Sequence, residues 1–160
     1  MRYLKWISLA LAIAVLFLGA GSRETKLTEG IQPGNLAPEI HWQGIDLKGD
    51  GYVLLQFWAA YDPQSRFENT RMYHVISRSG IAGLRMISIS FDESTAVFQG
   101  IIKTDHLDEA TQWNEERGTR SALFKAYRLK AGFGNYLLDS KGVIVAKNVS
   151  PMEALERISL

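Results

Sequence analysis

Residues 52–63 read Tyr-Val-Leu-Leu-Gln-Phe-Trp-Ala-Ala-Tyr-Asp-Pro, and they hold the strongest signals of secondary structure in the chain. Its first part, up to the tryptophan, is almost continuously apolar and too short for a helix, which predicts a buried central strand. A helix is expected to begin directly afterwards, because Asp62 is a good N-cap and Pro63 suits the first helical position. The helix should run to about Ser79 and end at Gly80.

Further strands and helices alternate along the rest of the chain. A second strand is predicted over 84–90, and a β-hairpin over 135–139 and 143–147, with a glycine in its turn. Three more helices are predicted from apolar residues at helical spacing or from capping residues. One follows Asp92 or Ser94, a short one includes Leu123, Phe124 and Tyr127, and the last begins at Ser150-Pro151.

This order of elements predicts an α/β fold with a mixed sheet. Strands that alternate with helices form a parallel core, and the closing hairpin adds antiparallel strands at one side. Helices are therefore expected on both faces of the sheet. The segment 104–118 is polar apart from Leu107 and Trp113, and we expect an ordered connection there without assigning it a shape.

The composition excludes several classes of function. The chain has 160 residues, of which 46% are hydrophobic, which suits one compact domain. Eighteen basic and seventeen acidic residues give a net charge of +1, too little to favour binding of a nucleic acid. The chain has no cysteine, so disulfides, thiolate nucleophiles and iron–sulfur clusters are excluded.

The N-terminus has the pattern of an export signal. Within residues 1–22, Arg2 and Lys5 precede an uncharged run from Trp6 to Leu18, and small residues follow. The run is shorter than the roughly 20 residues that span a bilayer, which favours a cleaved signal peptide over a signal anchor. Either alternative exports the remainder to the periplasm or cell envelope.

The rest of the chain divides into two parts. Residues 23–33 are polar with little apolar periodicity and are expected to form a tether. Residues 34–160 are expected to form the folded domain. In the anchored alternative, the protein contacts the membrane only through residues 1–22.

The domain resembles the TlpA/ResA-type thioredoxins of the bacterial cell envelope. The resemblance covers most of residues 34–148, and its most specific part is the Phe-Trp-Ala block ahead of the helix that starts at Pro63. It extends through Phe91-Asp92, 127–129 and 136–142. The resemblance implies a thioredoxin-like fold and, in the family, thiol–disulfide exchange through two cysteines.

The resemblance also implies that this chain lacks the family's chemistry. The two redox cysteines of the family correspond to Asp62 and Ser65, neither of which can form a disulfide. The family's cis-proline corresponds to Phe133 or its neighbour Gly132, where a trans backbone is expected because a cis bond to a residue other than proline costs about 3 kcal/mol. We therefore assign no catalytic residue and expect no enzyme activity.

One cluster remains a candidate binding surface. In the family, the rim around the cysteines and the cis-proline receives an extended partner segment. The corresponding positions here combine aromatic and adaptable polar side chains, which are typical of protein contacts. The predicted rim consists of Trp58, Tyr61, Asp62, Gln64, Phe133 and Asn135. The alternative is that Trp58 and Tyr61 belong to the core and that Phe133 fills the space of the missing proline.

No metal or cofactor site is predicted. His41, His74 and His106 lie far apart in the sequence and on different predicted elements, so a shared metal site is not expected. Residues 105–109 include acidic side chains and a histidine, but they lack the regular spacing of a calcium loop.

Three functions are compatible with this sequence. The first is an exported, redox-inactive domain that binds an extended peptide segment or another envelope protein. The second is an accessory component of thiol–disulfide or peroxide metabolism that acts beside a partner bearing cysteines. The third is a small-molecule binder that uses the hollow of the vacated active site.

Overall fold

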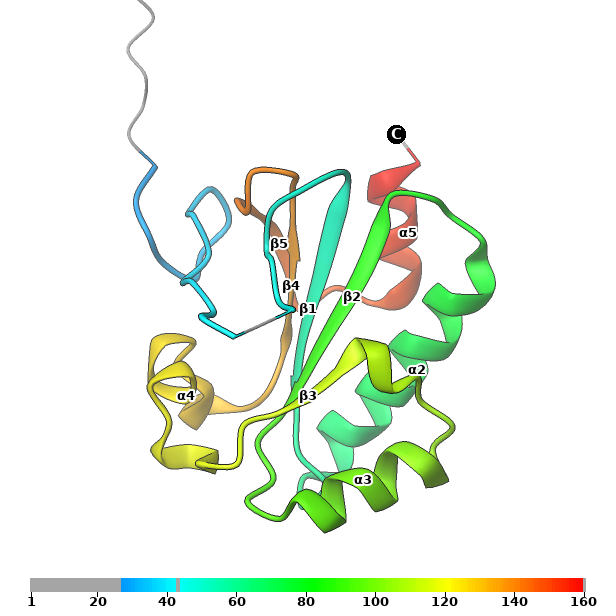
Figure 1. The fold of residues 1–160 in the computed structure, drawn as a ribbon. Coiled ribbons are helices and arrows are strands. Elements are labelled where there is room, and N and C mark those ends of the chain that lie inside the picture. The colour runs from blue at the N-terminus through cyan, green and yellow to red at the C-terminus, as the bar shows by residue number, and fades with distance from the viewer. Residues whose placement is uncertain (1–26, 43, 160) are drawn as a thin grey trace, which may run out of the picture.

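A computed structural model describes residues 27–42 and 44–159, and these residues form a five-stranded mixed sheet with helices on both faces (Figure 1). The order of the strands is β3-β2-β1-β4-β5. The strands are β1 (Tyr52–Trp58), β2 (Leu84–Ser90), β3 (Gln112–Asn114), β4 (Asn135–Leu138) and β5 (Ile144–Lys147). The helices are α2 (Pro63–Ser79), α3 (Thr95–Thr104), α4 (Ala122–Ala126) and α5 (Pro151–Ile158), with 3₁₀ turns at Glu109–Thr111, Gly118–Arg120 and Leu129–Ala131.

The pairing of the strands matches the predicted mixed sheet. β1 pairs in parallel with β2 along its whole length, and antiparallel with β4. β4 and β5 form the expected antiparallel hairpin. The central position of β1 explains its nearly continuous apolar sequence, since both faces of this strand are covered.

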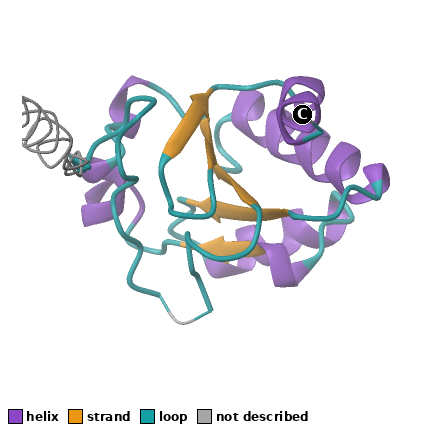
Figure 2. Cartoon of the chain, turned by 90° about the horizontal axis from the view of Figure 1, so that it is seen from above, coloured by secondary structure: helices purple, strands orange, loops and turns teal. Residues whose placement is uncertain are grey.

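The two faces of the sheet carry different layers (Figure 2). α2 and α5 pack on one face through a cluster that includes Leu54, Met72 and Ala154, and α3 joins them around Trp58. The other face is covered by α4 and by the segment that precedes β1. The α/β fold class with helices on both faces is therefore confirmed.

The ends of the helices follow the sequence signals. Asp62 caps α2, and Gly80 ends it with a φ of 64°, a left-handed conformation that glycine adopts without strain. Ser94 caps α3. Ser150 and Glu153 form a complete capping box at α5.

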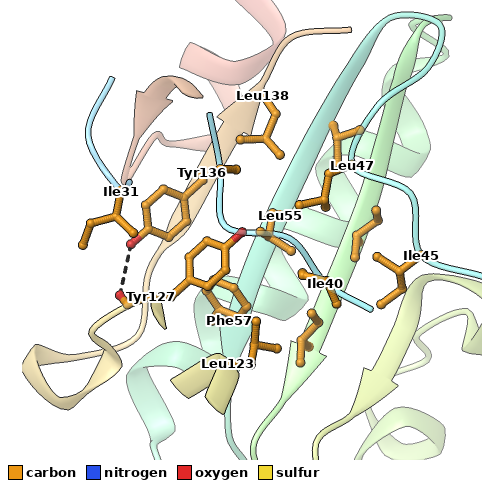
Figure 3. Packing of buried hydrophobic residues seen from close by; sticks show 14 of the residues in the cluster. Ile31, Ile40, Ile45, Leu47, Leu55, Phe57, Leu123, Tyr127, Tyr136 and Leu138 are labelled. Carbon is orange, nitrogen blue, oxygen red and sulfur yellow. Dashed lines mark hydrogen bonds between the residues drawn. The ribbon is translucent and has the colours of Figure 1, made fainter. Parts of the chain in front are cut away.

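The expected tether over residues 23–33 is wrong in its described part. Ile31 is only 8% exposed and lies in the same core cluster as Tyr136 and Leu138 (Figure 3). The backbone N–H of Gly30 donates to the oxygen of Leu36 at 3.0 Å, so this segment folds back on the domain. Leu27 and Ile31 are the two large apolar residues in this polar stretch, too few to establish a periodicity, which is why the sequence did not reveal the packing.

The segment 104–118 contains a strand that was not predicted. Its residues Gln112–Asn114 form β3, which pairs in parallel with Ser88–Ser90 at the edge of the sheet. Three residues are too few for a sequence pattern to show. Residues 1–22, the predicted signal or anchor, lie outside the described residues, and no helix within the described part is long and apolar enough to cross a bilayer.

Candidate functional site

Asp62 and Ser65, the positions at which the resemblance predicts the redox cysteines, bond to each other. The Asp62 carboxylate accepts a hydrogen bond of 2.8 Å from the backbone N–H of Ser65. In return, the Ser65 hydroxyl donates to the carbonyl oxygen of Asp62 at 3.1 Å. The same hydroxyl oxygen accepts from the N–H of Ala59 at 3.2 Å. These two side chains therefore satisfy backbone groups at the start of α2, which is a structural role.

A buried carboxylate holds the loop between β1 and α2. The two oxygens of Asp92 lie 3.0 and 2.9 Å from the N–H of Ala60, and one of them also accepts from the Ser90 hydroxyl at 2.6 Å. Asp92 is buried, so these bonds are the compensation for removing its charge from water. The sequence placed Asp92 at the end of a strand but gave no sign of this contact with Ala60.

Phe133, which with Gly132 is where the resemblance predicts the family's cis-proline, places an aromatic ring beside Tyr61. The ring stacks on Phe91 with 5.9 Å between centroids, and lies 6.2 Å from Phe124 and 6.3 Å from Tyr61. Every peptide bond within the described residues is trans, including the one between Gly132 and Phe133. Phe133 is half-buried, so one part of its ring packs on the core and another part faces solvent beside Tyr61.

Two residues of the predicted rim are not at the surface. Trp58 is fully buried and packs against Phe98 of α3, with ring centroids 6.2 Å apart. Asn135 is buried as well, and its side chain exchanges hydrogen bonds of 3.0 and 2.8 Å with the backbone of Val149. The prediction that Trp58 and Asn135 contact a partner is therefore wrong. The sheet and α3 enclose Trp58, and the side chain of Asn135 is hydrogen-bonded to the backbone after β5.

The other four members of the rim are exposed or half-buried and lie around the start of α2. They are Tyr61, Asp62, Gln64 and Phe133. Tyr61 and Phe133 meet through their rings. Tyr61 is the most prominent of them, with 60% of its surface exposed. Gln64 is exposed and its amide donates to Glu68 at 3.2 Å.

A surface hollow opens beside Tyr61. Its volume is about 680 Å³. It lies between the loop that Asp92 holds and the first two turns of α3, and its lining combines apolar residues with an acidic rim. The lining residues are Ala60, Tyr61, Phe91, Asp92, Glu93, Ser94, Val97, Ile101 and Thr119.

The electrostatic environment of the hollow is negative. The pKa of the Tyr61 phenol is raised, first by partial burial and then by the nearby carboxylates of Asp92, Asp62 and Glu93. Glu93 also lies 3.4 Å from the guanidinium of Arg120, in an exposed ion pair. An apolar hollow with carboxylates at its edge suits an apolar side chain flanked by a basic one.

An ion pair on the flank of the site joins α2 to the end of α3. The guanidinium of Arg66 donates to both oxygens of Asp105, at 2.7 Å for the Nε bond, and Thr70 donates to the same carboxylate at 3.2 Å. The hydrogen bonds from Arg66 hold the pKa of Asp105 below its usual range. The backbone oxygen of Asp105 lies 3.1 Å from Nε2 of His74. The sequence analysis found no calcium loop at residues 105–109 and gave no sign of this contact.

The described residues contain no group of three histidine, aspartate or glutamate side chains arranged to hold a metal ion. His74 contacts the backbone of Asp105, whereas His41 is an exposed residue 3.7 Å from Glu39.

Comparisons with known proteins agree with this geometry. No family model and no curated protein matches the sequence. Among solved structures, a thioredoxin-like protein from Parabacteroides distasonis ATCC 8503 is 41% identical, with a TM-score of 0.80 over 84% of this chain and 100% of that chain. A thiol-disulfide oxidoreductase from Bacteroides fragilis NCTC 9343 is 28% identical, with a TM-score of 0.55 over 68% of this chain and 79% of that chain. StoA from Bacillus subtilis has the same fold at 18% identity, with a TM-score of 0.55 over 70% of this chain and 83% of that chain.

The chain belongs to the thioredoxin-like proteins. Within them, its structural neighbours are the thiol-disulfide oxidoreductases of the TlpA/ResA/StoA type, and it is a degenerate member that has no cysteine. Without a thiolate, this chain has no group of its own for thiol–disulfide exchange.

Proposed function

We propose that the protein is an exported, redox-inactive thioredoxin-like domain that binds an extended segment of another envelope protein at the hollow beside Tyr61. The observation that carries this proposal is the combination of a capped, cysteine-free helix start with an open apolar hollow next to it. Asp62 and Ser65, at the positions expected for the redox cysteines, are bonded to each other. The neighbouring aromatic and aliphatic side chains are exposed.

The exposed apolar side chains support a binding role. Tyr61 is 60% exposed and Val97, across the hollow, is 47% exposed. Exposed apolar groups that gather around a concave surface are typical of interaction sites, whereas scattered ones are not. A tyrosine at the edge of such a hollow offers a large contact area and a phenol that can form hydrogen bonds.

The charges around the hollow support a partner with a basic residue. Asp62, Asp92 and Glu93 place negative charge near Tyr61. A partner segment that inserts an apolar side chain beside Tyr61 and carries a neighbouring lysine or arginine would complement this charge. The complementarity predicts that binding weakens as the salt concentration rises.

The proposed export depends on the N-terminal sequence. Residues 1–22 have the composition of a signal peptide or signal anchor. The relatives with this fold include thiol-disulfide oxidoreductases, whose chemistry requires an oxidising or redox-controlled compartment. We therefore place the folded domain in the periplasm or cell envelope.

The binding proposal is tested by selecting peptides from a displayed library on the folded protein. The selected peptides should contain an apolar residue next to a lysine or arginine. Their affinity should fall at least about tenfold on Tyr61→Ser, which corresponds to about 1.4 kcal/mol. Met152→Ser is the matched control, because Met152 of α5 is also 60% exposed but does not line the hollow. Equal loss of binding in both variants, or no loss in either, would contradict the proposal.

A second candidate function is the binding of a small molecule in the same hollow. The volume of about 680 Å³ favours this alternative, since it lies within the range of ligand pockets, roughly 300–1,000 Å³. A native mass spectrum of the protein purified from its own envelope distinguishes the two functions. A bound small molecule that Tyr61→Ser releases would support the second candidate over the first.

A further inference from the structure

The beginning of β2 has an open edge. β2 pairs with β1 along all seven of its residues, from Leu84 to Ser90. On its other side, β3 pairs only with Ser88–Ser90. No described strand therefore lies beside Leu84–Ile87 on the side away from β1.

The register identifies which backbone groups face this open edge. In a strand of a parallel sheet, the N–H and C=O of one residue point to the same neighbouring strand, and those of the next residue point to the opposite side. The N–H of Phe91 bonds to Trp58 on the β1 side, whereas the oxygen of Ser90 accepts from Glu115 on the β3 side. The backbone N–H and C=O groups of the even-numbered residues of β2 therefore point away from β1.

Leu84 and Met86 consequently direct their N–H and C=O groups to the open edge. Among the described residues, none donates to or accepts from these backbone groups on that side. Unpaired donors and acceptors at the spacing of a strand are a template for another extended backbone.

A groove follows this edge. Its volume is about 620 Å³. One wall is the second half of α2, with Tyr73 and Ile76. The other wall is formed by Thr111 and Trp113, next to the start of β3.

We propose that the edge from Leu84 to Met86 accepts an extended segment of another protein as an additional strand. Only an extended backbone supplies donors and acceptors in alternation at this spacing, so the geometry favours a peptide over a compact ligand. The stretch Leu84–Ile87, which has no strand beside it on this side, spans about 13 Å at about 3.3 Å per residue. Alternate side chains of the segment would contact the α2 wall, with Tyr73 and Ile76, and the opposite wall, with Thr111 and Trp113.

The position of this edge favours a segment from another molecule over the chain's own N-terminal part. The first described residues reach the domain at the opposite side of the sheet, where Leu36 bridges to Val143 beside β5. The groove also lies at the far end of α2 from the hollow beside Tyr61, so this surface is separate from the proposed partner site.

Amide hydrogen exchange followed by NMR on the whole protein tests this proposal. Met86 and Ile87 are a matched pair, because they are neighbours in β2 and face opposite sides. In the monomer, the Met86 amide should exchange at least about tenfold faster than the Ile87 amide, which is bonded within the sheet. A Met86 amide as slow as the Ile87 amide would overturn the proposal, since the edge would already be covered.

The acceptor role of the edge is tested with a defined peptide. The probe is an acetylated and amidated heptapeptide, Lys-Val-Thr-Val-Thr-Val-Lys, and its control is the same peptide with N-methyl groups on its three central residues. The probe should slow exchange at Met86 and leave Ile87 unchanged, and the methylated control should have no effect. Absence of protection at millimolar probe would overturn the proposal. Protection that rises with protein concentration, together with a dimer mass, would assign the edge to a second copy of this chain and overturn the assignment to another protein.

Discussion

The carboxylate of Asp62 and the backbone N–H of Ser65 are joined by a hydrogen bond of 2.8 Å, at the two positions where the resemblance predicts the redox cysteines of the family. The start of a helix favours negative charge, which in the redox enzymes stabilises a thiolate. Here the same backbone groups stabilise the carboxylate of an N-cap. The fold has kept the geometry of the helix start and uses it for stability.

The capping role of Asp62 predicts a modest loss of stability when its carboxylate is removed. Asp62→Ala should lower the free energy of unfolding by about 1 kcal/mol, and Asp62→Asn by less, because asparagine also caps helices. Chemical denaturation measures the difference. Gln64→Ala, at an exposed position in the same turn, is the control and should have little effect. Full stability of Asp62→Ala would remove the cap assignment.

The contact between Asp92 and Ala60 predicts a larger effect. Asp92→Ala leaves the N–H of Ala60 and the hydroxyl of Ser90 without their acceptor, and should cost about 2 kcal/mol of unfolding free energy. Glu93→Ala is the control. Glu93 is the next residue in the chain, and its side chain is exposed and makes no such contact with the backbone. Similar stability of the two variants would show that Asp92 does not hold the loop.

The ion pair between Arg66 and Asp105 predicts a dependence of stability on pH. The pKa of Asp105 is lower in the folded protein than in the unfolded chain, mainly because Arg66 donates to it. The stabilisation is therefore present above the unfolded pKa of about 3.9 and is lost as the pH falls through the folded value.

Asp105→Asn should accordingly be less stable than the wild type at pH 7, by about 1–2 kcal/mol, and the difference should shrink below about pH 4. Urea denaturation across this pH range measures the difference. Glu68→Gln removes the charge from the ion pair with Arg71 on the same helix, and it should change the stability little because Glu68 is more exposed than Asp105, 31% against 12%. A constant difference for Asp105→Asn between pH 7 and pH 3 would contradict the assignment.

The N-terminal sequence predicts processing on export. The intact mass of the protein recovered from the envelope should correspond to a chain that begins near Gly21, Ser22 or Arg23. Recovery of the full-length chain from membranes alone would replace the cleaved signal with an anchor.

Strong local signals made the main elements predictable. Asp62-Pro63 and Gly80 mark both ends of α2, and Ser150 with Glu153 marks the start of α5. The fold followed from these signals and from the apolar run of β1, because capping and burial are decided within a few residues of sequence.

Contacts between distant segments were not predictable in the same way. Asp92 lies 32 residues from Ala60, and Arg66 lies 39 residues from Asp105, so no local pattern connects them. Trp58 was assigned to the rim from its place beside the family's motif, but α3 covers it, and only the packing of that helix decides this. The sequence thus indicated that Tyr61, Asp62, Gln64 and Phe133 gather around the start of α2, where the structure places them, and their role in binding stays a prediction. It gave no sign of the Asp92 carboxylate that holds the loop.

Placing cysteines at Asp62 and Ser65 tests whether this thioredoxin-like domain has a helix cap where its relatives carry their redox site. The variant that combines Asp62→Cys with Ser65→Cys should close a reversible intramolecular disulfide under mild oxidant, measured by mass and by resistance to alkylation. The wild type should show no reduction of insulin, and each single variant should form no intramolecular disulfide. Two thiols that stay open to alkylation under oxidant, in a double variant with native circular dichroism, would contradict the claim.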